Sequence, residues 1–497
     1  DLFVIENGAT LRTTETVTQG SPMKMEGEDG GCVENLKDFI IETPVEGTLL
    51  TKKGDGWMKL NTACPSLERL ALDGGTVQCV ACDKPARTVE FRSGTLYENT
   101  GSSYAIHVSE GGSGTWSLAN RSTYTNKITG EGTLTIYCAV EHGNGWFATR
   151  TPVAVNLAQF TGTINATADM ADTYPRFTLN TSSGMPDGTL NIAGGVTVQN
   201  TGRTFRIGKL AGKGALGGYA SFANDGATGV NTWQVGCDDD FTWVGTVTAN
   251  SKLEKVGSGK MTVSGVWDNT GEVAVKEGTL CLNDRSAENA MLGSGELSVE
   301  DGAVLCGLGK LGNASVTVER GGSLYSETRA GALDFSGKRL TVSAGGEVMF
   351  NVASKVRCTT LEGISSFSLR GTLKVSVREG LELEAGDEFQ LWTANRTVLS
   401  SACTLDLDSP GEGLEWDTSA LEDGVLKVKT ATGITGVVSG EPVDCVVYTL
   451  DGARAGYFTC MPSEVRVYME ENGFKSGMYM VKMTQGQRTV SRKVTVD

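Results

Sequence analysis

An acidic run has residue types and a spacing that could do chemistry. Asp238, Asp239 and Asp240 stand beside Phe241 and Trp243. Clustered carboxylates can bind a cation, and a pair of them can perform the acid–base steps of polysaccharide cleavage. Because successive side chains of a strand point to opposite faces, at most Asp238 and Asp240 can converge on one cation or sugar. A solvated turn is the alternative interpretation, and it is the one that we favour.

The two histidines, His107 and His142, add no catalytic pattern. Histidine-assisted catalysis needs a nucleophile beside the ring, and no G-x-S-x-G segment accompanies either residue. Cys79 and Cys82 form a C-x-x-C pair, but no second pair stands at the distance that a zinc site uses. We therefore expect no catalytic residue, no metal ion and no cofactor.

Tryptophans are the remaining candidates for contact with a ligand. An exposed indole can stack on a sugar ring, whereas a buried one fills a corner of a core, and the second role is the more frequent. Six tryptophans are concerned, namely Trp57, Trp116, Trp146, Trp233, Trp243 and Trp267.

The elements that would position these residues follow from composition. The chain has 497 residues, with 66 glycines against 10 prolines, and a formal net charge of -16. Such an acidic chain repels nucleic acid, so we expect no nucleic-acid partner. No apolar stretch reaches the length of a transmembrane helix. Glycine without a collagen period indicates many turns between short strands.

An internal repeat shows how those strands are arranged. Residues 50–79 align without a gap on residues 253–282, so that Lys52, Gly54 and Gly75 recur 203 positions later. Apolar and polar residues alternate in both copies, the period of a half-buried strand. A coil of this kind cannot bury its inward row alone, so the coils must stack with little helix. We expect inward rows that include Leu60, Leu70, Val77, Val263, Val273 and Leu280.

The repeat also explains the cysteines. The 12 cysteines are scattered singly, unlike a disulfide framework. Cys79 takes the place that Leu282 holds in the second copy, which indicates a small apolar residue of the inward row. We expect thiols that are mainly free and buried, with at most one or two disulfides.

The pattern L-x-K-x-G-x-G-x-L-x-L, followed by x-G-T-L-x-L, resembles the autotransporter-associated β-strand repeat of bacterial surface proteins. The segments 307–327 and 386–428 resemble the late coils and the closing part of such passengers. The resemblance implies an all-β fold, a right-handed parallel β-helix or solenoid. It divides the chain into a solenoid of degenerate repeats over 1–370 and a closing segment over 371–430.

A second module follows a small-residue linker over 431–440. Residues 441–497 alternate as antiparallel strands, from which we expect a small β-sandwich of two packed sheets. The module resembles the C-terminal type IX secretion sorting domain of Bacteroidota proteins, which implies that outer-membrane export or surface-anchoring machinery recognises it. The match is carried by Tyr448, Leu450, Asp451, Gly452, Gly477, Tyr479, Val481, Lys482, Gly486, Lys493 and Val494.

Together these features favour a non-enzymatic β-solenoid outside the cell or on the outer-membrane exterior. It would act as a stalk or adhesin-like passenger, with surface glycans or host proteins as partners. Two alternatives remain open, a β-helical polysaccharide lyase or hydrolase that uses the acidic run, and a glycan-binding accessory module.

Overall fold

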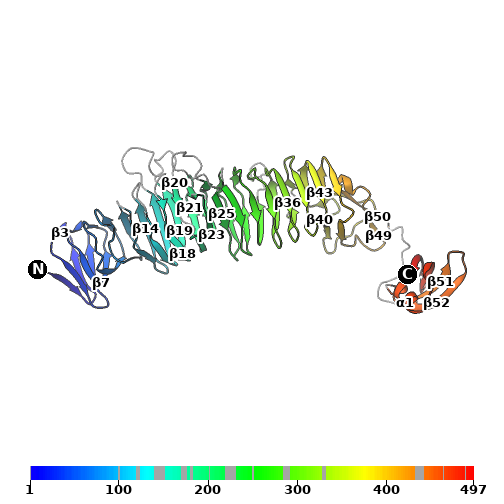
Figure 1. Cartoon of the computed structure of the whole chain (residues 1–497), viewed down its shortest axis with the longest axis horizontal. Coiled ribbons are helices and arrows are strands. Elements are labelled where there is room, and N and C mark those ends of the chain that lie inside the picture. The colour runs from blue at the N-terminus through cyan, green and yellow to red at the C-terminus, as the bar shows by residue number, and fades with distance from the viewer. Residues whose placement is uncertain are drawn as a thin grey trace.

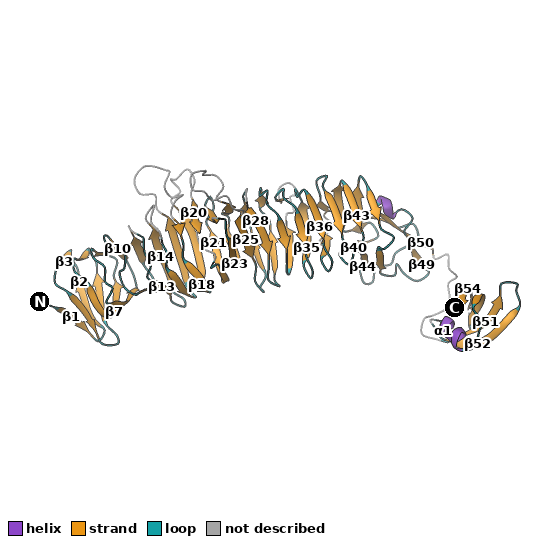
Figure 2. Cartoon of the chain, in the orientation of Figure 1, coloured by secondary structure: helices purple, strands orange, loops and turns teal. Residues whose placement is uncertain are grey.

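The chain is almost wholly β-structure. The computed structural model describes residues 2–98, 101–118, 124–138, 152–168, 176–179, 183–200, 202–218, 231–248, 251–283, 291–326, 332–430, 442–462, 464–486 and 488–496. Their strands stack into a parallel solenoid of about 14 turns, drawn out as a rod (Figures 1 and 2). The predicted all-β parallel solenoid is confirmed.

Most strands of the rod pair in parallel with a strand one coil earlier, one coil later or both. The longest ladder contains β3 (Val17–Gln19), β6 (Phe39–Ile41), β8 (Trp57–Leu60), β10 (Thr76–Cys79), β12 (Thr95–Glu98), β14 (Ser113–Leu118), β16 (Thr133–Cys138), β19 (Thr163–Ala168), β21 (Met185–Ile192), β23 (Thr204–Gly212), β25 (Asn231–Val235), β28 (Ser251–Lys255), β31 (Val273–Val275), β34 (Leu297–Val299), β36 (Ser315–Val318), β39 (Arg339–Val342), β43 (Ser366–Leu369) and β47 (Thr397–Leu399).

A second ladder covers the N-terminal coils. Its strands are β1 (Phe3–Glu6), β2 (Ala9–Thr13), β4 (Met23–Glu26), β5 (Gly31–Asn35), β7 (Val45–Lys53), β9 (Leu67–Leu72), β11 (Thr88–Phe91), β13 (Ala105–Val108), β15 (Lys127–Gly130) and β18 (Asn156–Phe160). A shorter ladder contains β17 (Pro152–Val153), β20 (Arg176–Leu179), β22 (Thr197–Asn200), β24 (Ala215–Gly218) and β27 (Thr246–Val247).

The later coils have further ladders of their own. The main one contains β26 (Phe241–Trp243), β29 (Lys260–Val263), β32 (Thr279–Asn283), β35 (Val304–Lys310), β37 (Ser323–Ser326), β40 (Glu347–Ser354), β44 (Thr372–Val377) and β48 (Thr404–Leu407), with β41 (Arg357–Cys358) antiparallel to β40. Shorter pairings join β30 (Val266–Trp267) to β33 (Met291–Leu292), and link β35 with β38 (Ala332–Asp334), β42 (Thr360–Ile364) and β46 (Trp392–Ala394).

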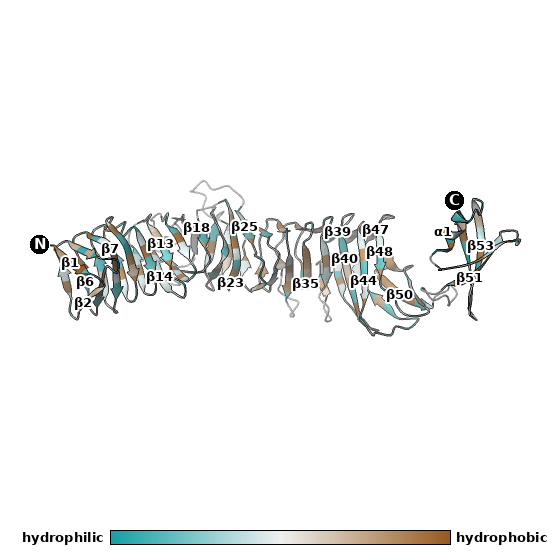
Figure 3. Cartoon of the chain, turned by 90° about the horizontal axis from the view of Figure 1, so that it is seen from below, coloured by the Kyte–Doolittle hydropathy of each residue, from teal (hydrophilic) through white to brown (hydrophobic). Residues whose placement is uncertain are grey.

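The rod is held together by its inward rows. All six side chains that the repeat assigned to these rows are at most 1% exposed, which confirms the prediction. Figure 3 shows hydrophobic and hydrophilic residues alternating along the strands. Burying one such side chain contributes about 1.5–3 kcal/mol. Because the coils stack in register, the inward side chains form one continuous cluster from Ile5 to Val428.

The repeated lysine ties each glycine turn to the next coil. The Nζ of Lys52 donates to two carbonyl oxygens of its own turn, at 2.8 and 2.6 Å, and to the Gly74 carbonyl at 3.4 Å. The Nζ of Lys255 makes the equivalent bonds, at 3.0 and 2.8 Å, and a third to the Glu277 carbonyl at 3.0 Å. Both residues are fully buried, and burial lowers the pKa of each ammonium to about 8. Both copies of the repeat therefore contain a buried lysine that cross-links two coils, as well as a row of inward apolar residues.

Parallel stacking continues past residue 370 and ends in an antiparallel sheet. Strand β44 pairs with β48, so the coils extend to Leu407. The closing sheet has the order β45 (Glu388–Gln390), β50 (Val425–Thr430) and β49 (Leu414–Asp417), beside the 3₁₀ turn η2 (Leu421–Asp423). The predicted linker over 431–440 lies outside the described residues.

The C-terminal module is antiparallel, as expected, but the two-sheet sandwich is wrong for the described residues. They form a single sheet in the order β52 (Arg454–Cys460), β51 (Val443–Thr449), β53 (Gly477–Gln485) and β54 (Arg488–Val496). Helix α1 (Val465–Glu471) supplies the second layer instead. It lies in a long connector whose apolar side chains Val465 and Met469 join the core of the sheet. Val465 and Met469 are four residues apart, so both lie on the face of the helix that packs against the sheet.

The cysteines behave mainly as the repeat indicates. The eleven cysteines that the structure describes form no disulfide, and seven of them are buried. Cys79 is fully buried and lies opposite Leu60 of the preceding coil. The thiol therefore packs in the inward row, where Leu282 lies in the second copy of the repeat.

Candidate functional site

A polar groove crosses the outward side of strands in the N-terminal third of the rod. It encloses about 480 Å³ and is lined by Glu28, Thr48, Glu68, Arg69, Thr88, Glu90 and His107. Parallel strands lie about 4.8 Å apart. Because the lining residues come from successive coils, the groove runs along the rod axis. It is one of the concave surfaces of the described rod that could receive a ligand.

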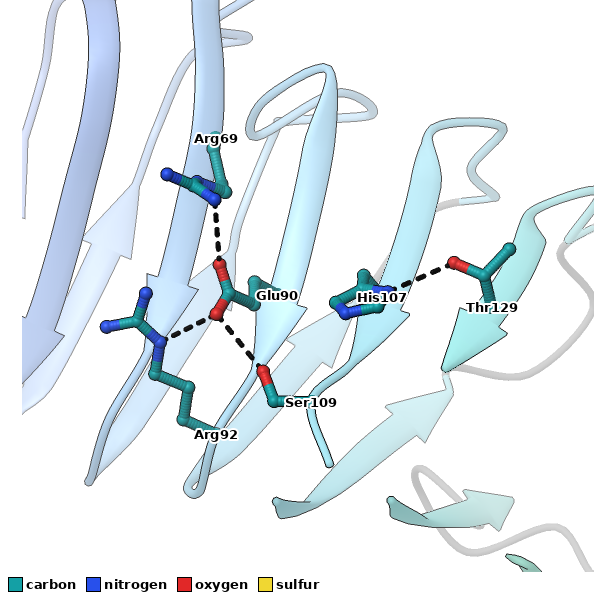
Figure 4. Close-up of polar contacts among 6 residues, drawn as sticks. All are labelled: Arg69, Glu90, Arg92, His107, Ser109 and Thr129. Atoms are coloured by element: carbon teal, nitrogen blue, oxygen red, sulfur yellow. Dashed lines mark hydrogen bonds and ion pairs between the residues drawn. The ribbon is translucent and has the colours of Figure 1, made fainter. Parts of the chain in front are cut away.

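Glu90 lies at the centre of the groove and is 7% exposed. Its carboxylate accepts bonds from Arg92 Nε at 2.7 Å and from the Ser109 hydroxyl at 3.1 Å (Figure 4). Arg69 Nη1 lies 3.5 Å from the second oxygen. Burial alone would raise the pKa of Glu90, but bonding to Arg92 and Ser109 and the charge of Arg69 outweigh burial and lower it. The residue is an ionised clamp between coils.

His107 lies beside Glu90 in the same outward row. The register places these two residues opposite each other, and Thr129 follows on the next strand. The ring is exposed, and Nδ1 lies 3.2 Å from the Thr129 hydroxyl (Figure 4). A threonine hydroxyl takes the place that a carboxylate holds in a catalytic triad. His142 lies outside the described residues.

The groove combines charges and hydroxyl groups that can hydrogen-bond to a polar ligand. A general base needs a free lone pair near its substrate. Glu90 instead directs both carboxylate oxygens at arginine, and Ser109 is bound to that carboxylate. Sequence reasoning missed Glu90 and Arg69. The alternation of residues along the strands indicates that both side chains point outward. Their contact, however, depends on the length of the coil between them.

The acidic run is used to join two coils. The Asp238 carboxylate accepts a bond from the Ser258 hydroxyl at 2.7 Å, and Asp240 accepts one from the Lys260 amide at 2.7 Å. Bonds from Ser258 lower the pKa of Asp238. Asp239 points elsewhere, to Lys209 Nζ at 2.6 Å. The described contacts of Asp238 and Asp240 are thus those of a turn that holds the next coil.

Most of the candidate tryptophans lie in the core. Trp116, Trp233, Trp243 and Trp267 are at most 1% exposed and pack in the rod interior. Trp57 is different, because 40% of it is exposed. Trp146 lies outside the described residues.

A buried carboxyl group, which sequence reasoning also missed, lies inside the rod. Glu98 is 1% exposed and accepts bonds from the Tyr104 hydroxyl at 2.6 Å and the Trp116 indole at 2.7 Å. The Ser102 hydroxyl donates a third bond at 3.0 Å. Burial raises the pKa of Glu98 to about 7, although these three donors oppose the shift. The sequence indicates this burial, because Glu98 lies two residues after the inward Leu96 and therefore points to the same side of the strand.

Thiols lie near this carboxyl group without forming a metal centre. Cys79 is opposite Glu98 in the register, and Cys82 contacts Cys79. The hydrogen bond with Cys82 and burial raise the pKa of the Cys79 thiol well above its usual value. Across the described ranges, no three His, Cys, Asp or Glu side chains come together as metal ligands would.

The residues that match the sorting domain are spread over the C-terminal module. Asp451 and Gly452 form the predicted hairpin turn between β51 and β52, with Gly452 at a φ of 89°. Tyr479 is 9% exposed, and its hydroxyl donates to the Lys475 carbonyl at 2.9 Å. Val481 is buried. The remaining matched residues are Tyr448 and Lys482 on the strands, Leu450 and Gly486 in turns, Gly477 at a strand start, and Lys493 and Val494 on the last strand.

Comparison with known proteins adds no family to these observations, because the chain matches no family model and no curated protein sequence. In the part of the chain that the structure describes, no helix has the length and apolar character needed to span a membrane. A functional conclusion must therefore rest on the rod and on its surface residues.

Proposed function

We propose that the chain is a non-enzymatic rod outside the cell or on the cell surface, a stalk or adhesin-like passenger that contacts glycans along its side. The observation that carries the proposal is how the outward carboxylates are used. Glu90, Asp238 and Asp240 each accept hydrogen bonds from neighbouring coils. Such groups stiffen a spacer, whereas an active site keeps its carboxylates available to substrate.

The place of action is proposed from the C-terminal module. Its core shares no residue with the core of the rod, as a separately recognised domain requires. Resemblance to a type IX sorting domain supports export through the outer membrane, with export or anchoring machinery as the partner of this module.

A turnover assay tests the non-enzymatic part of the proposal. The purified full chain is incubated with a panel of polysaccharides, and new reducing ends and unsaturated products are measured. We expect no turnover from the wild type. Turnover that Asp238→Asn with Asp240→Asn removes, or that Glu90→Gln removes, would identify a polysaccharide lyase or hydrolase and overturn the proposal.

A further inference from the structure

An aromatic pair lies on the outward side of the N-terminal coils, away from the groove residues. Trp57 on β8 is 40% exposed, and its ring centroid lies 6.3 Å from that of Tyr97 on β12, with the planes at 53°. Strand β10 runs between these two strands. The two rings therefore border a shallow surface that spans three coils.

The floor of this surface is polar and uncharged. Thr76 and Gln78 of β10 lie opposite Trp57 and Lys59 in the register. Both are partly exposed. The neighbouring charge of Lys59 is already paired, because its Nζ lies 2.7 Å from an Asp38 carboxylate oxygen. A ligand here meets an indole face, hydroxyl groups and an amide, with no unpaired charge on this floor.

The second copy of the repeat shows that the fold does not need aromatic residues here. The alignment of the two copies places Lys260 where Trp57 lies. The pairing of β32 with β35 extends that equivalence, so that Cys306 occupies the place of Tyr97. The equivalent strands β29 and β32 keep the same register as β8 and β10. The coils can therefore stack with a lysine at this position. Stacking alone does not explain why the first copy has an exposed tryptophan there.

We infer that Trp57 and Tyr97 form a stacking site for a neutral sugar ring of a polysaccharide, a step that rests on the glycan contact in the proposed function. A pyranose ring has an apolar C–H face that packs on an aromatic ring and hydroxyl groups that bond to side chains such as Thr76 and Gln78. A stable protein interface buries about 800 Å² on each partner. Two rings over a polar floor suit a sugar better than such a partner.

The test replaces Trp57 by the residue that the second copy carries. Wild type and Trp57→Lys are compared by affinity electrophoresis in gels that contain a soluble glucan, mannan or xylan. We expect at least one polymer to retard the wild type, and Trp57→Lys to lose at least tenfold in affinity with an unchanged melting temperature. The polymer should also shield wild-type tryptophan fluorescence from acrylamide, and this shielding should be absent from Trp57→Lys, which lacks the exposed indole.

Two matched variants sharpen the test. Trp57→Phe should keep part of the affinity, because it retains an apolar ring, while Lys252→Met, at an exposed ion pair on a later coil, should leave binding unchanged. Equal binding by wild type and Trp57→Lys, or no retardation of the wild type by any of the three polymers, would overturn the stacking site. Turnover of a polymer would overturn the non-enzymatic proposal instead, so the two failures are distinguishable.

Discussion

At the scale of single residues, the buried carboxyl of Glu98 makes the stability of the rod sensitive to pH. A carboxyl inside an apolar core is more easily kept neutral than ionised. Tyr104, Trp116 and Ser102 all direct donors at it, which partly compensates the ionised form. The balance leaves its pKa at about 7, against an ordinary value of 4.5.

This shift predicts how stability changes with pH. The folded state binds the proton of Glu98 more tightly than the unfolded state does. The contribution of Glu98 to the free energy of unfolding is therefore complete below pH 4.5 and is lost as pH rises through about 7. The loss between pH 4.5 and 8 is on the order of 3 kcal/mol. Urea unfolding at several pH values measures it, and Glu98→Gln should flatten that part of the profile. An equally steep profile in Glu98→Gln would contradict the assignment.

The buried lysines give a second residue-scale prediction. Replacing Lys52 by Met leaves its three carbonyl acceptors without their donor, at a cost of about 1–3 kcal/mol. Lys255→Met should cost a similar amount, because the contacts are equivalent. Thermal unfolding measures both, with Lys252→Met at an exposed ion pair as the control that changes little. A neutral effect of both core variants would show that the carbonyls find other donors.

At the scale of elements, the glycine turns set how closely successive coils approach. Gly75 and Gly278 occupy equivalent turns, and both have a φ of 61°. A Cβ on Gly75 would lie 2.2 Å from the Gly54 carbonyl oxygen, and one on Gly278 would lie 2.5 Å from that of Gly257. Each turn therefore needs glycine both for its backbone conformation and for contact with the coil below.

Alanine substitutions at two glycines distinguish the cost of the backbone conformation from the cost of the close contact with the next coil. Gly302 has a φ of 74° but open space around its Cβ position, so Gly302→Ala should cost about 1–2 kcal/mol for conformation alone. Gly75→Ala should cost at least twice as much, because the added methyl group meets backbone. Melting temperatures of the two variants check this, and equal losses would show that coil spacing adjusts easily.

At the scale of the whole molecule, the C-terminal module has a hydrophobic core of its own. Its core contains Val447, Met469 and Val481, none of which belongs to the core of the rod. Residues 441–497 carry seven acidic and seven basic side chains, so the net charge of -16 belongs to the rest of the chain. A module of this kind can be recognised independently of the rod.

Truncation after Thr430 tests this independence. The melting temperature of the rod should stay unchanged, since the described apolar residues of the module belong to a separate core, and calorimetry measures it. In the native host the truncated rod should remain inside the cell while the full chain reaches the surface, as surface labelling of intact cells would show. Normal surface display of the truncated rod would refute a sorting role, and a lowered melting temperature would identify the module as a cap.

The sequence by itself determined the parallel solenoid and its inward rows. The gapless repeat and its period-two apolar positions depend only on local chain geometry, so Leu60 and Val263 could be assigned without coordinates. The hairpin turn at Asp451 and Gly452 followed in the same way from turn chemistry. Only the tertiary structure decided the site. Arg69, Glu90 and Ser109 meet because coils of particular lengths align them, and the exposure of Trp57 depends on which segments pack over its strand. The tertiary structure also decided the helix in the C-terminal module, because burial of Val465 and Met469 against a single sheet depends on packing between distant segments.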